Sequence, residues 1–176
     1  MTSQTLAVPM PELQRVGFED AWDAHRARVF HWALRYGAGD AAFAEDLTHD
    51  VFLKLWASLP TLDAHDDLGG WLYTVTARLA LSRLRAKRGL LGVLAQWLQP
   101  SDAPGPDDAL DARRSSAAAL AALGKLPEKQ RVVLCMISLD GLSQREVALQ
   151  LKLSEGYVSK LVHRGQQALR AMGCDV

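Results

Sequence analysis

Apolar residues recur along most of the chain at intervals of three and four positions, and no stretch alternates apolar and polar residues for long. The first spacing is typical of amphipathic helices, whereas alternation would indicate a half-buried strand. In the first half the pattern predicts helices over about 18–36, 40–58 and 68–88, with Asp40 placed to cap the second of them. In the second half it predicts a helix to about 123 that Asp107 or Asp108 would cap, another from 127 onward, and two within 143–170. We therefore predict an all-α fold.

A stretch rich in helix breakers divides the chain. Residues 99–111 (QPSDAPGPDDALD) contain three prolines, one glycine and four aspartates, a composition that discourages helix and strand alike. We interpret them as a flexible linker between two small helical domains, 18–98 and 112–176, with an amino-terminal extension over 1–17. A chain of 176 residues is long enough for two such domains.

The last two predicted helices have the features of a helix-turn-helix. Ser143 followed by Glu146 is a capping-box pattern, and Ser154 is placed to cap the second helix. One arc of that helix is apolar, and the opposite arc has no acid and holds Ser159, Lys160, His163, Arg164, Gln167 and Arg170. Such side chains donate hydrogen bonds to base edges and phosphates in the major groove. The pattern alone also fits a helix with a solvated polar face.

The helix predicted over 40–58 has an unusual side opposite its apolar arc. Acidic residues and a histidine alternate there with large apolar residues: Glu45, Asp46, His49 and Asp50 with Phe52, Leu53 and Trp56. Apolar anchors among acids favour a protein-binding surface. The alternative is that this helix lies between two others, which would bury Phe52 and Trp56 without any partner protein.

The helix predicted over 68–88 gathers one aromatic and several basic residues on one arc, namely Trp71, Arg78, Arg85 and Arg88. Guanidinium groups bind phosphates, and aromatic rings stack on unpaired bases, so this arc suits nucleic acid. A solvated basic helix end that complements the helix dipole would explain Arg85 and Arg88 equally well.

Charge and composition narrow the possible functions. The 20 basic and 20 acidic residues sum to a net charge of zero, which excludes a global basic field, so any nucleic-acid site must be local. No apolar run approaches the roughly 20 residues that a membrane helix needs, and the amino terminus does not resemble a secretory signal. Cys135 and Cys174 are too few for a disulfide framework or a four-thiolate zinc site. We expect a cytoplasmic protein without metal or cofactor.

Taken in order, these segments resemble the extracytoplasmic-function (ECF) sigma factors, the small two-domain initiation subunits of bacterial RNA polymerase. Residues 44–56 (AEDLTHDVFLKLW) are similar to the family's polymerase-binding helix, and residues 69–85 (GGWLYTVTARLALSRLR) to its −10 recognition segment. Residues 126–148 and 153–170 are similar to its −35 module.

The resemblance implies a role for each segment. Core RNA polymerase would be contacted by Asp46, His49, Asp50, Leu53 and Trp56. The −10 strands would be contacted by Trp71, Arg78, Ser82, Arg85 and Arg88, and the loop over 61–70 would hold a flipped base. The −35 duplex would be contacted by Ser159, Lys160, His163 and Arg164. Promoter-specific transcription initiation is then the expected function, without a catalytic residue and with core polymerase, promoter DNA and an anti-sigma factor as partners.

Two departures from the family pattern affect these expectations. Arg78 and Ser82 stand where the family commonly has Asn and Asp, so we expect charge to contribute more to holding the melted strand. Lys152 stands where a glycine is usual in the −35 turn, which predicts either a different turn or a left-handed lysine.

Two rival functions belong to other classes. A helix-turn-helix regulator that binds DNA as a dimer, without polymerase, would require a palindromic site and a stable homodimer. A metal enzyme would use Asp46, His49 and Asp50 as ligands at helical spacing, but such helical carboxylate sites usually need a second motif, which we do not find in the sequence.

Overall fold

The computed structural model describes residues 12–62, 67–94 and 111–174, and their arrangement is helical throughout. The elements are α1 (Glu12–Tyr36), α2 (Ala41–Ser58), the 3-10 turn η1 (Leu59–Thr61), α3 (Leu68–Leu94), α4 (Asp111–Gly124), α5 (Glu128–Leu134), the π-helical segment η2 (Cys135–Leu139), α6 (Gln144–Leu151) and α7 (Glu155–Ala171). Within these ranges there is no strand, so the all-α prediction is confirmed.

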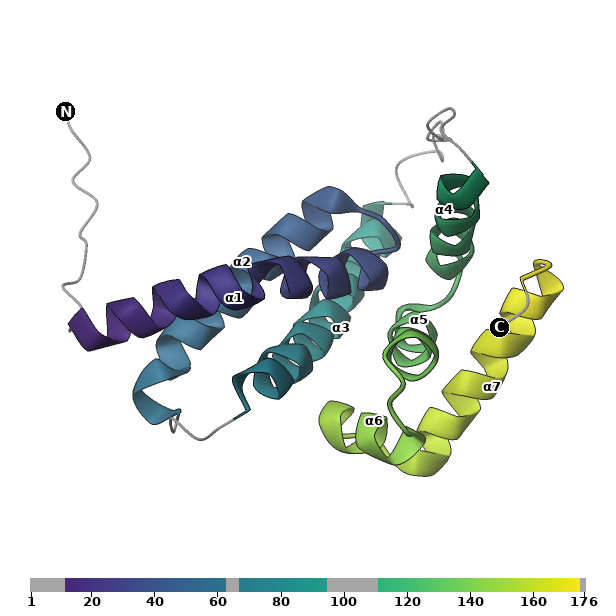
Figure 1. Ribbon diagram of the computed structural model, residues 1–176. Coiled ribbons are helices and arrows are strands. Elements are labelled where there is room, and N and C mark those ends of the chain that lie inside the picture. The colour runs from purple at the N-terminus through teal and green to yellow at the C-terminus, as the bar shows by residue number, and fades with distance from the viewer. Residues whose placement is uncertain (1–11, 63–66, 95–110, 175–176) are drawn as a thin grey trace.

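Helices α1, α2 and α3 form an amino-terminal module (Figure 1). Their apolar arcs meet in a core whose largest fully buried side chains are Tyr36, Leu47, Phe52, Leu55 and Leu72. Asp40 caps α2 as predicted, since its Oδ1 accepts a hydrogen bond from the amide of Phe43 at 3.0 Å. The two ends of the module are longer than the sequence predicted, because α1 begins at Glu12 and α3 continues to Leu94.

Helices α4 to α7 and the η2 segment form a carboxy-terminal module. Its core contains Val132, Val133, Leu134 and Met136 from the α5–η2 rod, together with apolar residues of α6 and α7. The predicted capping box at Ser143 and Glu146 is present, and the Ser154 hydroxyl accepts from the amide of Tyr157 at 3.3 Å. Pro127 precedes α5 in the cap position, whereas the predicted cap at Asp107 or Asp108 lies outside the described residues.

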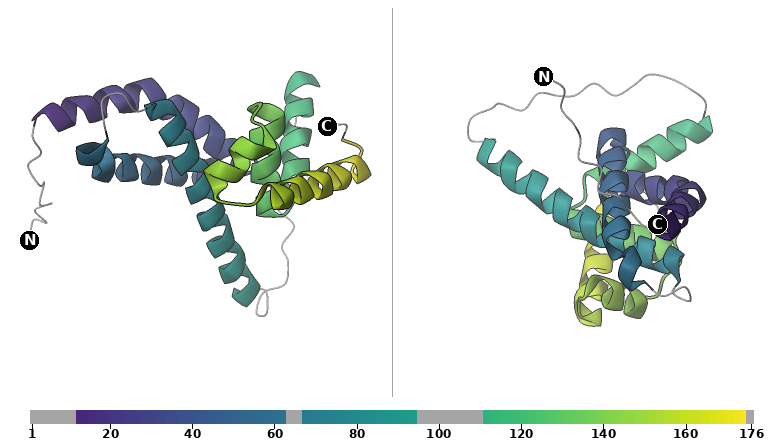
Figure 2. Two further views of the ribbon diagram at one scale, coloured as in Figure 1. Left: turned by 90° about the horizontal axis from the view of Figure 1, so that it is seen from below. Right: turned by 90° about the vertical axis from the view of Figure 1, so that its left-hand side faces the viewer.

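The two modules are in direct contact. Helix α3 lies against α5 and α6, and the end of α1 reaches α5. Figure 2 shows α5 and α6 between α3 and α7, with α7 directed away from the amino-terminal module. The sequence predicted two modules and a linker but gave no sign of this contact.

Candidate functional site

The outward side of α2 combines exposed apolar and acidic side chains. Leu53 is 65% exposed and Trp56 is 40% exposed, and the Asp46 side chain is 72% exposed. His49 is also exposed, and Asp50 is half-buried. We call these five residues the α2 surface. A leucine and a tryptophan facing solvent among carboxylates suit the anchors of a protein interface.

Each of the two interpretations of α2 holds for some of its apolar residues. Phe52 is only 1% exposed and belongs to the core, so the prediction that it shares the outward face is wrong. Helix α1 is responsible, because Trp22 lies edge-on to Phe52, with ring centroids 4.7 Å apart. Leu53 and Trp56 stay accessible, which keeps the protein-binding interpretation for those two residues.

Helix α1 adds aromatic residues to the α2 surface that sequence reasoning missed. The Phe18 ring lies edge-on to Trp56, with centroids 5.0 Å apart, and Trp22 lies beside His49 at 6.2 Å. Phe18, Trp22, His49, Phe52 and Leu53 line a shallow groove of about 350 Å³ between the two helices. The spacing of Phe18 and Trp22, four positions apart on a helix, is the signal that could have revealed it.

Part of the acidic charge on α2 is already engaged within the module. Arg83 of α3 forms an ion pair with Asp50, and it also lies 3.6 Å from Asp46. These contacts join α2 to α3 at a half-exposed position. Asp50 therefore stabilises the module as well as contributing to the surface, whereas Asp46 extends further into solvent.

The outward side of α3 carries the basic residues singled out in the sequence. Arg78, Ser82 and Arg85 are exposed and Trp71 is half-buried; we call these four residues the α3 face. They recur at positions that share one side of a helix. Arg88 continues α3, but its side chain is outside the described residues, as are residues 63–66 of the loop predicted to hold a base.

The start of α3 is fixed by Asp67. The amide of Gly70 donates to Asp67 Oδ1 at 3.1 Å, and the amide of Trp71 donates to the Asp67 carbonyl at 2.9 Å. A Cβ at position 70 would lie 2.5 Å from Asp67 Oδ2, so a larger residue there would displace the capping carboxylate. Trp71 is thereby held in the first turn of α3.

Arg78 has a partner in the other module. Its Nε donates to the Gln150 carbonyl of α6 at 2.6 Å. By contrast, Arg85 donates from Nε to Leu81 of its own helix, at 3.1 Å. The most central cation of the α3 face is thus occupied by the carboxy-terminal module.

The polar side of α7 is open. Ser159, Lys160, His163 and Arg164, which we call the reading face, are all exposed, while Val158, Leu161, Val162, Gly165 and Leu169 are buried. The helix approaches α5 closely at Gly165, where a Cβ would lie 2.6 Å from Leu134 Cδ1. The arcs that the sequence predicted are therefore present.

The turn between α6 and α7 contains a left-handed lysine, which is one of the two possibilities predicted from the sequence. Lys152 caps α6 with φ 55° and ψ 47°, which is the left-handed conformation. A non-glycine residue is strained in this region because its Cβ approaches the neighbouring carbonyl. The turn therefore keeps the geometry that usually calls for glycine, and a lysine adopts it.

Tyr157, at the start of α7, is a further exposed residue that sequence reasoning missed. It is 38% exposed, and the Lys129 ammonium of α5 lies 5.2 Å from the centre of its ring. An aromatic ring and a cation beside the reading face suit contact with a phosphate backbone.

The described residues hold no cluster of three or more His, Cys, Asp or Glu side chains placed to bind a metal ion. A search of the same residues finds no helix with the length and hydropathy required to cross a bilayer.

Comparisons with known proteins agree with the two modules. Residues 21–89 match the family described as Sigma-70 region 2, and residues 116–169 match that described as Sigma-70, region 4. The ECF RNA polymerase sigma factor SigW of Bacillus subtilis is 26% identical over 163 residues, covering 87% of both chains. SigE of Mycolicibacterium smegmatis is 31% identical over 158 residues, covering 85% of this chain and 60% of the relative.

Two solved structures share the fold. One is the sigma factor RpoE of Bartonella quintana in complex with the anti-sigma factor NepR, with a TM-score of 0.63 and 22% identity, covering 88% of this chain and 95% of that chain. The other is CnrH in complex with the cytosolic domain of CnrY, with a TM-score of 0.57 and 23% identity, covering 90% of this chain and 88% of that chain.

Proposed function

The chain belongs to the extracytoplasmic-function RNA polymerase sigma factors, and we propose that three separate surfaces divide its work of directing promoter-specific initiation. The α2 surface binds core RNA polymerase, the α3 face holds the melted −10 strand, and the reading face of α7 binds the −35 duplex. Sigma factors act by binding rather than by covalent chemistry, so these surfaces need no catalytic group. The module bounds 18–98 and 112–176 enclose both family matches and remain a prediction.

The reading face is the observation that carries the proposal. It stands on the second helix of a helix-turn-helix, has no acid, and lies opposite a buried apolar arc. A helix seated in this way presents side chains to the major groove while its module contacts the backbone. Lys160 and Arg164 supply the charge for phosphates or guanine edges, and Ser159 and His163 supply shorter donors.

The α3 face supports the −10 role through charge and one aromatic ring. Arg78 and Arg85 extend from one side of the helix, and Asp67 fixes Trp71 at its start. Guanidinium groups attract the phosphates of an unpaired strand, and an indole ring stacks on its bases. Because the net charge of the chain is zero, we expect weak binding to free DNA and tight binding only within the polymerase complex.

An anti-sigma factor is the third partner that we propose. Of the two solved structures described above, the sigma factor RpoE is in complex with the anti-sigma factor NepR, and CnrH is in complex with the cytosolic domain of CnrY. A polymerase-independent dimeric regulator is not favoured, because the relatives that match over most of their length are polymerase sigma factors.

The test is run-off transcription with purified core polymerase on a library of genomic fragments. The wild-type chain is expected to co-elute with core polymerase and to redirect initiation to a discrete set of promoters. Lys160→Ala with Arg164→Ala is expected to lose at least about tenfold in run-off product without losing co-elution. Lys125→Ala, an exposed cation of the same module that lies outside α7, is the matched control. A wild-type chain that neither co-elutes nor redirects initiation would refute the proposal.

A further inference from the structure

A carboxylate of the carboxy-terminal module is inserted between two helices of the amino-terminal module. Asp140 follows the η2 segment, and its side chain is only 13% exposed. The Arg35 guanidinium of α1 donates to Asp140 Oδ1 at 2.5 Å, and the Tyr73 hydroxyl of α3 donates to Oδ2 at 2.7 Å. Both oxygens of one carboxylate therefore bind the other module. We call Asp140, Arg35 and Tyr73 the Asp140 clamp.

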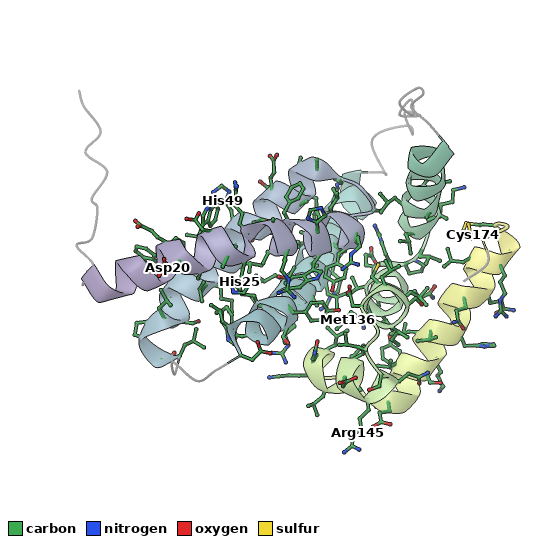
Figure 3. The ribbon with its side chains drawn as sticks, viewed as in Figure 1. Asp20, His25, His49, Met136, Arg145 and Cys174 are labelled. Atoms are coloured by element: carbon green, nitrogen blue, oxygen red, sulfur yellow. The ribbon has the colours of Figure 1, made fainter. Side chains whose placement is uncertain are left out.

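The π-helical segment positions this carboxylate. The amide of Asp140 donates to the Cys135 carbonyl at 3.1 Å, and the amide of Leu142 donates to the Met136 carbonyl at 3.1 Å. A π turn inserts one extra residue into a helix and is often found at functional positions. Here it ends the α5–η2 rod with Asp140 directed at α1 and α3. Figure 3 labels Met136 on this rod, whose helix α5 lies against α3.

A second contact lies close by on α3. Gln150 is among the last four residues of α6, whose carbonyls lack partners within their own helix. The Arg78 guanidinium binds one of these carbonyls, at the negative end of the α6 dipole. The same guanidinium is one of the two that we assign to the melted −10 strand. It cannot bind α6 and a DNA phosphate through the same Nε.

We infer that this chain has a closed state, held by the Asp140 clamp, in which helix α6 holds Arg78 through its Nε and must release it before that guanidinium is fully free to bind the −10 strand. The inference rests on the proposed role of the α3 face. Closure thus engages one −10 cation, while the reading face stays exposed. The partner of Arg78 in the closed state is the chain's own helix α6.

The chemistry of the clamp makes the closed state reversible. Arg35 is 27% exposed, so closure removes both charges largely from water, and their attraction only partly offsets that loss of hydration. On opening, both groups regain water. Burial raises the pKa of Tyr73, and the hydrogen bond and charge of Asp140 raise it further, so the hydroxyl keeps the proton that it donates. The 16 residues between α3 and α4 allow about 50 Å of separation if extended.

The first test measures the shape of the free chain by small-angle X-ray scattering. Wild type is expected to match the closed arrangement, and Asp140→Ala is expected to raise the open-to-closed ratio about tenfold, because the variant removes an ion pair and a charge-assisted hydrogen bond from the Tyr73 hydroxyl. Tyr73→Phe keeps the ring and should open the chain less. Asp20→Ala, an exposed aspartate toward the other end of α1 (Figure 3), is the matched control. Circular dichroism establishes that each variant is folded.

The second test asks whether opening frees Arg78. The probe is a fluorescent oligothymidylate of about 20 nucleotides, long enough for stacking and phosphate contact, and the readout is its anisotropy. Asp140→Ala is expected to bind it several-fold more tightly than wild type. That gain should disappear when Asp140→Ala is combined with Arg78→Ala.

Each outcome decides one part of the inference. An extended wild type, or a folded Asp140→Ala variant with an unchanged scattering curve, would overturn the clamp. An opened variant without a gain in oligonucleotide binding would overturn the engagement of Arg78 by α6. Neither measurement involves polymerase, so failure here leaves the run-off test of the sigma function independent.

Discussion

Helices α2 and α7 are built alike, but the side chains that they expose to a binding partner differ in chemistry. They have 18 and 17 residues, each has a side-chain amino-terminal cap, and each buries an apolar arc. The α2 surface keeps Leu53 and Trp56 in solvent among carboxylates, whereas the reading face has neither an acid nor a large apolar group. Amphipathic periodicity therefore predicts that each helix packs, and the chemistry of its outward side predicts what it binds.

The largest expected effect is the loss of polymerase binding by the α2 surface. Leu53→Ala with Trp56→Ala removes the two exposed apolar anchors, and truncating such anchors weakens protein interfaces by about 2–4 kcal/mol. We expect core polymerase binding, measured by competition with a labelled wild-type chain, to fall at least about 30-fold. Lys54→Ala, an exposed neighbour on the same helix, should bind normally. Equal losses in both variants would show that the anchors are not specific.

The next largest effect is expected on stability, where α7 packs against α5. Gly165→Val places side-chain atoms where even a Cβ would lie 2.6 Å from Leu134 Cδ1, and overpacking of this kind destabilises by about 1–3 kcal/mol. The measurement is urea unfolding followed by circular dichroism. Gly156→Val, in the same helix with nothing within 4 Å of its Cβ position, is the control and should be at least as stable as wild type. A stable Gly165→Val variant would show that α7 can shift away from α5.

The salt dependence of DNA binding distinguishes the reading face from the α2 surface. Removing Lys160 and Arg164 should lower the slope of log affinity against log salt by about 2 for a −35 duplex taken from a promoter found by run-off transcription. The α2 surface depends on apolar anchors, so Leu53→Ala should leave that slope unchanged. An unaltered slope after loss of both cations would place the phosphate contacts elsewhere on the carboxy-terminal module.

A smaller effect on stability is expected at the turn between α6 and α7. Lys152 is held in the left-handed conformation, which costs a non-glycine residue roughly 1 kcal/mol. Lys152→Gly should therefore stabilise the carboxy-terminal module by about that amount, seen as a higher urea midpoint. Lys160→Gly, in the body of α7, should lower it instead. A lower midpoint for Lys152→Gly would mean that the lysine side chain makes a compensating contact.

The smallest effect concerns the two caps. The amide of Phe43, and then Lys87, lower the pKa of Asp40, whereas Ser154, which caps α7, does not titrate. The Asp40 contribution is thus complete above the unfolded pKa of about 4 and is lost as the pH falls through the lower folded value. Asp40→Asn keeps a capping side chain without this titration. Its stability should fall less than that of wild type between pH 7 and pH 3, by urea unfolding; an equal fall would assign the acid sensitivity to other carboxylates.

How well the sequence predicts a feature depends on how far apart along the chain the interacting residues lie. The caps at Asp40, Ser143 and Ser154 and the arcs of α7 involve residues within a few positions of one another, and these predictions are confirmed. The burial of Phe52 depends on Trp22, thirty positions away, and a helix pattern cannot decide which of two adjacent apolar residues a second helix covers. The contact of Asp140 with Arg35 and Tyr73 had no local signal at all, because it joins a turn to two distant helices.

The π turn before Asp140 has a consequence for chain length. Deleting one residue within Cys135–Leu139 would restore ordinary helical hydrogen bonding and rotate everything after it by about 100° relative to the rod. Each helix could still form, but the carboxylate would no longer meet Arg35 and Tyr73, and the packing of α7 on α5 would have to adjust. Loss of a single codon, without any substitution, would thus remove the closed state.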